Sequence, residues 1–401
     1  MQQRPGTVVQ AFFTAFVPIF VLAIAQTALP VLAPSLMGAA GMPAEAFGWV
    51  SGAMGLGAVW LYMANAAFTT ALGPVRACQV SGVVTGTGLL FVLSGHYAAM
   101  LLGAILIGFG YATTTPAGSQ ILADHTPREM RATLFSLRQA GVPLGGALAG
   151  IGGSWIATHI GWTWAIVLVS ALSLAVAPAL VLAPRQFNES RPRARFRFAA
   201  LFALSNVLQP IRVVRRDRAL LQISIASIGF ATVQGTVSTY FVIYTTSQLG
   251  FSLTYAGTLF ATMQAMSVLG RIVLGLLADR IGSPRPVLRT LSILSACAAI
   301  ALATLDASWP TVAHYAVLVF MGLTVATWNG LWLAEVAAMA VDNVSEATAS
   351  ATFFVFGTYM VTPPLMGLVI RTWGYRPAFL LAATIVAAAL VILSLPQRRT
   401  P

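Results

Sequence analysis

Long apolar blocks separated by short polar segments dominate the chain. Each block is about 20 residues or longer, the length that an α-helix needs to cross the hydrocarbon core of a bilayer. The blocks predict six spans in the first half and six in the second: Phe12–Leu36, Phe47–Leu72, Val75–Ser94, Ala98–Ala123, Ala132–Thr158, Trp162–Leu182, Ala219–Ser247, Ala256–Ala278, Val287–Leu305, Pro310–Ala340, Ala347–Thr372 and Pro377–Leu395. The pattern therefore predicts an all-α membrane protein with twelve transmembrane helices.

The longest polar stretch separates these two sets of spans. It runs from residue 184 to residue 218 and holds nine arginines against the two acids Glu189 and Asp217. We expect an N-terminal six-helix bundle over residues 1–183, this basic cytoplasmic linker, and a C-terminal six-helix bundle over residues 219–401. Residues 196–208 of the linker either form an amphipathic helix on anionic lipid or belong to a plain linker that sets the topology.

The composition excludes an ordinary soluble protein. Only 8% of the residues are charged and 58% are hydrophobic, whereas a soluble domain carries about 25% charged residues. All 22 basic residues are arginines, a bias that fits a GC-rich bacterial genome, and the net charge is +12. The arginines lie between the apolar blocks, as the positive-inside rule expects, and not in a patch for nucleic acid.

The distribution of arginines also predicts the orientation. With both termini in the cytoplasm, only Arg371 and Arg376 would lie on the outer side, whereas the reverse orientation would place the basic linker outside. We therefore expect a multi-pass protein of the bacterial inner membrane with both termini cytoplasmic. Its partners are the lipid bilayer and a small molecule, and we expect a monomer.

Metal, cofactor and catalytic chemistry have no support in the sequence. Cys78 and Cys297 fall in different apolar blocks, and the four histidines lie at or near span ends without a His-Glu-x-x-His pattern. No nucleophile with a base, no paired acids at depth and no soluble signalling domain are recognisable. An intramembrane enzyme or a sensor is therefore only a distant alternative, and we expect no enzyme, no metal and no cofactor.

A short motif follows the eighth span, Gly275-Leu276-Leu277-Ala278-Asp279-Arg280-Ile281-Gly282. We expect Gly275 to permit close helix packing, Asp279 to cap a helix or pair with an arginine, and Gly282 to permit a tight turn. The motif and its place after six spans, a basic linker and two further spans resemble the loop signature of the major facilitator superfamily. The corresponding first-half loop lacks the signature, with Thr70 and Ala71 in place of the acid and the arginine.

This resemblance covers essentially the whole chain. It implies two pseudo-symmetric six-helix bundles, transport by alternating access, and a conformational latch formed by Gly275, Asp279, Arg280 and Gly282. In the fifth span, Gly141-Val142-Pro143-Leu144-Gly145-Gly146 resembles a glycine–proline motif associated with exporters. Because related runs also occur in importers, it indicates first of all a flexible, closely packed helix.

An ionisable side chain in hydrocarbon costs at least ~2.5–3.5 kcal/mol at a helix centre, so each one needs a reason. Arg271 of the eighth span shares a helical face with Gln264, Ser267 and Gly275. Residues 270–275 resemble the eighth span of monocarboxylate transporters and oxalate:formate exchangers, in which an arginine meets the substrate carboxylate. Guanidinium suits that role because its planar fork forms two parallel bonds to a carboxylate. The alternatives are an arginine that extends to the cytoplasmic face and an arginine that pairs with a helix end.

Arg138 of the fifth span and Glu335 of the tenth span are the other two charges at depth. Arg138 could complete an anion clamp, pair with Glu335 as a gate, or bond to backbone carbonyls. Glu335 is the only acid expected within the hydrocarbon. Burial would let it carry a proton, and the alternative is a locking ion pair with an arginine.

Uncharged candidates line other spans. They are Tyr62 and Asn65 on the second span, Gln234 and Tyr240 on the seventh, Trp328, Asn329 and Trp332 on the tenth, and Tyr359 on the eleventh. Helical spacing places the three candidates of the tenth span and Glu335 on one aromatic and polar face, which we expect to line the cavity. For each of them, hydrogen bonding between packed helices is the competing role.

Two arginines against one acid leave the predicted cavity net positive. The sequence therefore favours a small organic anion, a carboxylate first, carried with protons in symport. A drug or metabolite exporter working as a proton antiporter is the alternative, favoured by the glycine–proline motif and by the aromatic character of the expected cavity.

Overall fold

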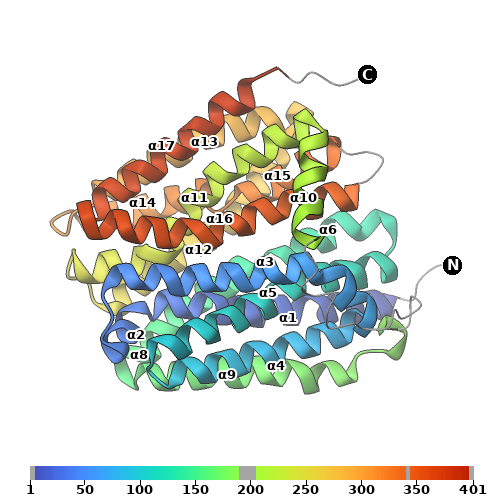
Figure 1. Cartoon of the computed structure of the whole chain (residues 1–401), viewed down its shortest axis with the longest axis horizontal. Helices are drawn as coiled ribbons and strands as arrows, with labels where there is room; N and C mark the ends of the chain where they lie inside the picture. Colours follow the sequence, from blue (N-terminus) through green and yellow to red (C-terminus); the bar gives the residue numbers. More distant parts are fainter. Residues whose placement is uncertain (1–4, 189–204, 340–343, 397–401) are drawn as a thin grey trace. The chain divides into compact units, whose positions relative to one another are not determined.

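The computed structural model describes residues 5–188, 205–339 and 344–396, without the side chains at positions 5, 64–67, 70, 128, 129, 132, 205–207 and 344–346. Throughout these residues the regular structure is helical and no strand occurs (Figure 1). Among them, twelve segments are long and apolar enough to cross a membrane. The twelve predicted spans are therefore confirmed, with ends that move by a few residues.

Contacts divide the chain into two compact units. The first comprises Met1–Gly41 and Ala53–Ala203, and the second comprises Met42–Gly52 and Leu204–Pro401. The division at residues 1–183, 184–218 and 219–401 stays a prediction. Most of residues 196–208, for which an amphipathic helix and a plain linker are the two alternatives, lies outside the described residues. The structure has a helix, α10, over Ser205–Arg216, which packs against α16 (Val344–Trp373).

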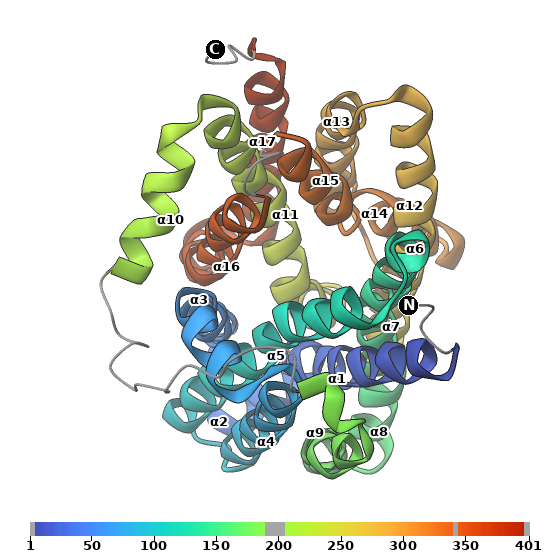
Figure 2. The same cartoon turned by 90° about the vertical axis from the view of Figure 1, so that its right-hand side faces the viewer.

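The first unit is built from α1, α4 to α9 and the larger part of α3, with the short α2 between the first two spans. Their bounds are α1 Pro5–Val31, α2 Ala33–Ala40, α3 Phe47–Leu72, α4 Pro74–Leu93, α5 Tyr97–His125, α6 Arg128–Gln139, α7 Gly141–Leu148, α8 Ser154–His159 and α9 Trp162–Ala179. α4 packs against both α5 and α9 (Figure 2). A Cβ on Gly88 of α4 would lie only 2.7 Å from the carbonyl oxygen of Gly103 on α5, so these two helices pack backbone to backbone.

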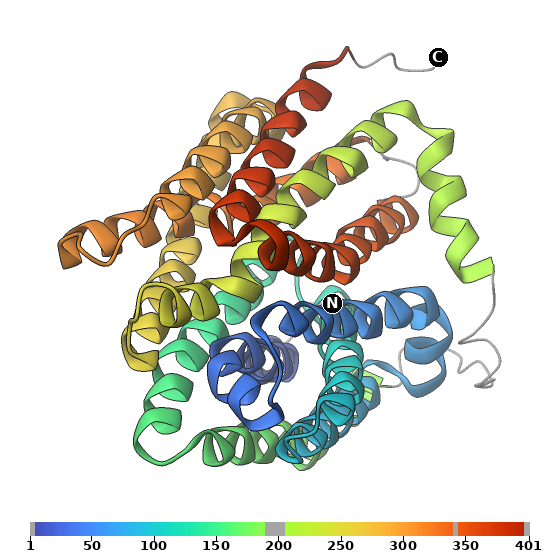
Figure 3. The same cartoon turned by 60° about the vertical axis from the view of Figure 1, so that its left-hand side comes forward.

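The second unit contains α10 and the helices α11 to α17. Their bounds are α11 Arg218–Ser247, α12 Leu253–Ile281, α13 Pro284–Ala303, α14 Thr311–Thr324, α15 Trp328–Met339, α16 Val344–Trp373 and α17 Tyr375–Ser394. α11 packs against α16 and α17, the two helices coloured orange-red to red in Figure 3. α11 is consequently the most buried span of this unit, with 78% of its most apolar 18-residue stretch inside the protein.

Local sequence explains where the helices of the second unit begin and end. The Asp217 carboxylate accepts the Ala219 N–H at 2.7 Å and so caps α11, and the Ser252 hydroxyl accepts the Tyr255 N–H at 3.2 Å to cap α12. α12 ends at Gly282, whose φ of 76° lies in the left-handed region that favours glycine. The tight turn predicted at Gly282 is thus confirmed.

Two spans are interrupted where the sequence analysis predicted continuous helices. The fifth consists of α6, α7, a π-helical turn over Ala149–Gly153, and α8. In the tenth, α14 ends at Thr324 and α15 begins at Trp328, so residues 325–327 break the helix near its middle. A break at membrane depth frees backbone groups that must find other partners, and it is tolerated where protein covers it. This tenth-span break is the centre of the candidate site.

Candidate functional site

The tenth-span break lies against Arg271 of α12. The Arg271 Nη2 atom donates to the carbonyl oxygen of Ala326 at 3.2 Å, and its side chain is only partly buried. The neighbouring Gly270 makes this approach possible, because a Cβ there would lie 2.5 Å from Thr327 Cγ2 and 3.1 Å from the Leu323 carbonyl. The guanidinium is therefore level with the middle of the tenth span, as the sequence predicted for its depth.

Three donors from two other spans converge on one amide oxygen beside this break. The Oε1 atom of Gln234 accepts from Trp328 Nε1 at 2.8 Å, from Tyr359 Oη at 2.9 Å and from Asn329 Nδ2 at 3.3 Å. An amide oxygen offers two lone pairs, so the longest of these bonds, from Asn329, is the weakest. The cluster joins α11, α15 and α16. The cluster thus brings together four candidate residues from three spans, the seventh, the tenth and the eleventh.

The cluster also lies on the accessible side of α11. From Gly229 to Thr245 every side chain of this helix is buried except Gln234 and Ser238, which are one turn apart and half-buried. Asn329 and Tyr359 are likewise half-buried. A ligand that reaches this face therefore meets the amides of Gln234 and Asn329 and the phenol of Tyr359. Ala326, whose carbonyl accepts from Arg271, precedes Asn329 by three residues. Discontinuous helices commonly build the binding sites of secondary transporters.

The tryptophans of the tenth span serve the core and not an aromatic cavity face. Trp328 is fully buried and stacks on Phe230 with ring centroids 5.4 Å apart. Trp332, 4% exposed, donates from Nε1 to the Ile223 carbonyl at 3.2 Å. Both rings therefore fasten α15 to α11. Tyr240 is also fully buried and donates to the Pro363 carbonyl at 2.7 Å.

Replacing Gln234 with leucine should destabilise the second unit, because the buried Trp328 N–H would lose its acceptor. An unsatisfied buried donor costs about 1–3 kcal/mol. We expect Gln234→Leu to lower the apparent melting temperature and the transport rate together, and Gln234→Glu to retain more of both because it keeps an acceptor. Ser238→Ala, on the same face of α11, is the matched control. A Gln234→Leu protein that melts like Ser238→Ala would show that the cluster contributes nothing to stability.

Arg138 lies inside the first unit, 1% exposed. Its Nη2 atom donates to the Thr114 carbonyl at 2.6 Å and to the Thr115 carbonyl at 3.3 Å, and its other nitrogens reach the Ala15 carbonyl and the Ser119 hydroxyl, each at 3.4 Å. A Cβ at Gly118 would lie 2.6 Å from Arg138 Nε, so glycine there leaves the space for the guanidinium. Of the three roles open to Arg138, the structure supports bonding to carbonyls.

Two further candidates belong to the second span. The Tyr62 hydroxyl interacts with the Thr115 side chain, close enough to Arg138 for the two groups to affect each other electrostatically. The side chain of Asn65 lies outside the described residues. Gln264, on α12, is half-buried and seven residues before Arg271, on the same helical face.

Glu335 forms an ion pair within its own unit. Its Oε1 lies 3.7 Å from Nη1 of Arg285, and both side chains are below 10% exposed. Arg285 also donates from Nε to the Leu393 carbonyl at 2.9 Å, and Arg289 donates to the same oxygen at 2.8 Å from Nη2. Arg285 is the second residue of α13, and Leu393 belongs to the last turn of α17. Glu335 therefore lies at the end of the membrane-spanning part, not deep within it as the sequence analysis expected.

The motif after the eighth span is only partly as expected. Asp279 and Arg280 are exposed, and the structure shows no hydrogen bond or ion pair of the Asp279 side chain to any residue it describes. A Cβ on Gly275 would meet nothing within 4 Å, so the close helix packing expected at Gly275 is not seen among the described residues and stays a prediction. The close approach of α12 is made one and a half turns earlier, at Gly270.

Sequence reasoning missed three contributors to these sites. Arg285 stands at the very start of its helix, among the arginines expected between spans, so its position in the sequence indicates no role in a site. Gly118 lies one turn after Thr114 and faces the same guanidinium, but a single glycine within a span carries no such signal. The break at residues 325–327 has only a weak signal, the polar pair Thr324 and Thr327 before Trp328-Asn329-Gly330.

Comparison with known proteins agrees with this architecture. The family model of the Major Facilitator Superfamily matches residues 14–357. An uncharacterised MFS-type transporter of Mycobacterium tuberculosis is 24% identical over 387 residues, which cover 92% of this chain and 80% of that protein. An MFS-type efflux pump of Mycolicibacterium smegmatis is 25% identical over 214 residues, 52% of this chain and 48% of the pump. The resemblance to monocarboxylate or oxalate:formate carriers stays a prediction.

Solved structures show the same fold. A point mutant of the nucleoside transporter NupG superposes with a TM-score of 0.73 at 13% identity, and the match covers 96% of this chain and 98% of that one. A bacterial homologue of the human lysosomal transporter Spinster gives 0.72 at 17% identity, with 97% and 95% covered. Twelve apolar spans, the motif ending at Gly282 and a family match over most of the length lead to one conclusion: this chain is a multi-pass membrane transporter, not an enzyme, and belongs to the Major Facilitator Superfamily.

Proposed function

We propose that this transporter moves a small organic anion, a carboxylate first, across the inner membrane by alternating access. The observation that carries the proposal is the partly exposed guanidinium of Arg271, which donates to the Ala326 carbonyl at the middle of the tenth span. Asn329, three residues further along the chain, shares the Gln234 amide oxygen with the phenol of Tyr359. A fixed cation at this depth is costly unless it serves a purpose. A carboxylate would bind the guanidinium by two parallel bonds.

The ion pair of Glu335 supports a role in coupling. A carboxylate paired with Arg285 at the end of the span can take a proton only if that pair separates or weakens. We therefore propose proton symport, in which protonation of Glu335 and opening of the pair accompany substrate movement. Both termini are proposed to face the cytoplasm, and a monomer suffices because the proposed substrate site lies within one chain.

A binding screen tests the substrate class directly. Purified protein is heated in the presence of aliphatic and aromatic carboxylates, nucleosides, sugars and lipophilic cations, and the apparent melting temperature is recorded. Binding to the folded state raises that temperature in proportion to the logarithm of ligand concentration over Kd. We expect carboxylates to stabilise and cations to have no effect. Stabilisation by cations alone would remove the anion proposal.

Export of a drug or metabolite by proton antiport is the second candidate. The glycine–proline segment of the fifth span supports it: a Cβ on Gly145 would lie 2.7 Å from the Phe20 carbonyl, so α7 packs closely on α1, and a π-helical turn follows. The similarity of half the chain to an efflux pump points the same way. Inside-out vesicles separate the two candidates, because an antiporter concentrates substrate when their interior is acid, whereas a symporter does not.

The motif after the eighth span is proposed as a conformational latch, formed by Gly275, Asp279, Arg280 and Gly282. Its exposed Asp279 is available to pair in another conformation. Asp279→Asn should slow transport by about tenfold, corresponding to about 1.4 kcal/mol, while substrate affinity stays near that of the unmodified protein. Turnover and Kd are measured separately on the same preparation. Unchanged turnover would reduce the motif to a helix terminator at Gly282.

A further inference from the structure

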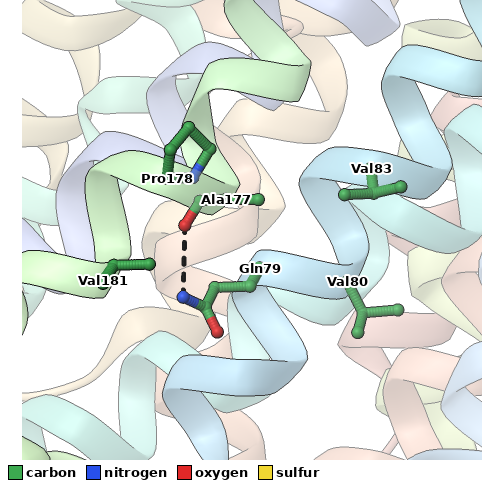
Figure 4. A pocket seen from close by; sticks show the side chains of 6 residues that line it. All are labelled: Gln79, Val80, Val83, Ala177, Pro178 and Val181. Atoms are coloured by element: carbon green, nitrogen blue, oxygen red, sulfur yellow. Dashed lines mark hydrogen bonds between the residues drawn. The ribbon is translucent and has the colours of Figure 1, made fainter.

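A groove of about 430 Å³ runs between α4 and α9 on the first unit (Figure 4). Its walls carry two valines of α4, Ala177 and Pro178 of α9, and Val181 of the 3-10 turn Leu180–Leu182 that follows α9. The residues that line it are Gln79, Val80, Val83, Ala177, Pro178 and Val181. The amide of Gln79 donates to the Ala177 carbonyl at 3.1 Å and so holds the walls at a fixed separation. The groove is an open, shallow depression between two packed helices, apolar except for this one amide.

The apolar walls of the groove face outward. Val181 is 71% exposed and Val83 is 44% exposed. On a soluble protein such exposure would be a liability, but in a membrane-spanning unit the surrounding medium is lipid. The volume lies in the range of ligand-binding clefts. An acyl chain is thus the occupant that the chemistry of the walls fits.

One end of the groove is positively charged. Arg76 lies one turn before Gln79 and Val80 on α4, and Arg185 follows Val181 of the other wall by four residues. These two ends are at the same side of the unit, because Asn188, three residues after Arg185, accepts the Val75 N–H at 3.2 Å and donates to the Leu72 carbonyl at 3.4 Å. Both arginines are exposed, and neither forms an ion pair with any residue that the structure describes.

We propose that this groove binds one anionic phospholipid, with an acyl chain along Val80, Val83 and Val181 and the headgroup phosphate between Arg76 and Arg185. In the expected orientation this lipid belongs to the cytoplasmic leaflet, which carries the anionic headgroups. Two independent features support the assignment, the apolar groove and the paired cations at its end. A neutral lipid would satisfy the first and not the second. The site is separate from the substrate site of the second unit.

The test uses delipidated, purified protein with phosphatidylglycerol or phosphatidylcholine added, and bound lipid is counted by native mass spectrometry. Each arginine near a headgroup contributes about fivefold in affinity, so Arg76→Gln with Arg185→Gln should bind phosphatidylglycerol about 25-fold more weakly. The pair Arg76→Lys with Arg185→Lys should retain most of the binding and shows that folding is intact. Val83→Trp should block the groove and lower binding of the acyl chain with the headgroup contacts in place.

Matched controls lie on the other unit. Arg371→Gln with Arg376→Gln removes two exposed arginines, and Val391→Trp enlarges a valine that is 64% exposed on α17. Both should bind phosphatidylglycerol like the unmodified protein. Inorganic phosphate should not compete at millimolar concentration, since the acyl chain supplies half of the recognition. Equal binding of the two lipids, an unchanged preference in the double glutamine variant, or displacement by free phosphate would each overturn the proposal.

Discussion

The Arg271→Ala variant is expected to lose binding of the anionic substrate altogether. Removing one partner of a desolvated ion pair leaves the other charge uncompensated, a penalty of about 3–5 kcal/mol, which corresponds to a loss of at least about 100-fold in affinity. Arg271→Lys keeps the charge but loses the planar fork, so it should bind with intermediate affinity. Calorimetry on purified protein measures Kd apart from transport rate.

The hydrogen bond from Arg271 to Ala326 makes a stability control necessary. Alanine at 271 also removes the donor that contacts the tenth-span break, so the apparent melting temperature of each variant is recorded alongside its affinity. Arg376→Ala removes an exposed arginine of the same unit and should leave Kd unchanged. A folded Arg271→Ala protein with unmodified affinity would exclude Arg271 from the substrate site.

Glu335→Gln is expected to abolish substrate accumulation driven by a pH gradient. Glutamine cannot exchange a proton, but its amide oxygen can still accept a hydrogen bond from Arg285, so the local packing survives. Exchange of labelled for unlabelled substrate, which needs no net proton movement, should continue. Proteoliposomes with an imposed pH gradient measure the first property, and counterflow without a gradient measures the second.

Arg285→Gln distinguishes proton coupling from locking. If the ion pair only locks one conformation, losing either partner has the same effect on both assays. If Glu335 carries the proton, Arg285→Gln retains accumulation, although it loses the contact with the Leu393 carbonyl and should be less stable. Gradient-driven uptake that persists in Glu335→Gln would place the proton path elsewhere or remove it.

The spans could be predicted because their signal is long and physical. A bilayer needs about 20 apolar residues for each crossing, and every predicted block meets that length. The turn at Gly282 was predictable for a similar reason, since few other residues adopt a positive φ. The predicted continuity of the fifth and tenth spans was wrong. In the tenth, residues 325–327 are Val-Ala-Thr, none of which breaks a helix by itself, so the break depends on tertiary partners such as Gly270.

The site was predicted as a set of residues but not as an arrangement. Helical spacing grouped Trp328, Asn329 and Trp332 on one face, yet burial divides them: the indoles lie in the core and the amide lies beside Gln234. Periodicity reports which residues share a face and cannot tell a core-facing aromatic from a cavity-facing one. The ion pair between Glu335 and Arg285 joins residues 50 positions apart in sequence, a relation that no local pattern contains.

The break in the tenth span has a geometric consequence for the rest of α15. This helix has 12 residues and is therefore ~18 Å long, and it carries Asn329 in its first turn and Glu335 two turns from its start. A rigid tilt of about 10° around residues 325–327 would displace Glu335 by ~2 Å. Such a displacement is large enough to turn the direct ion pair with Arg285, now 3.7 Å long, into a pair separated by solvent. The tilt of α15 therefore determines both whether Asn329 can reach the Gln234 amide and how far Glu335 lies from Arg285.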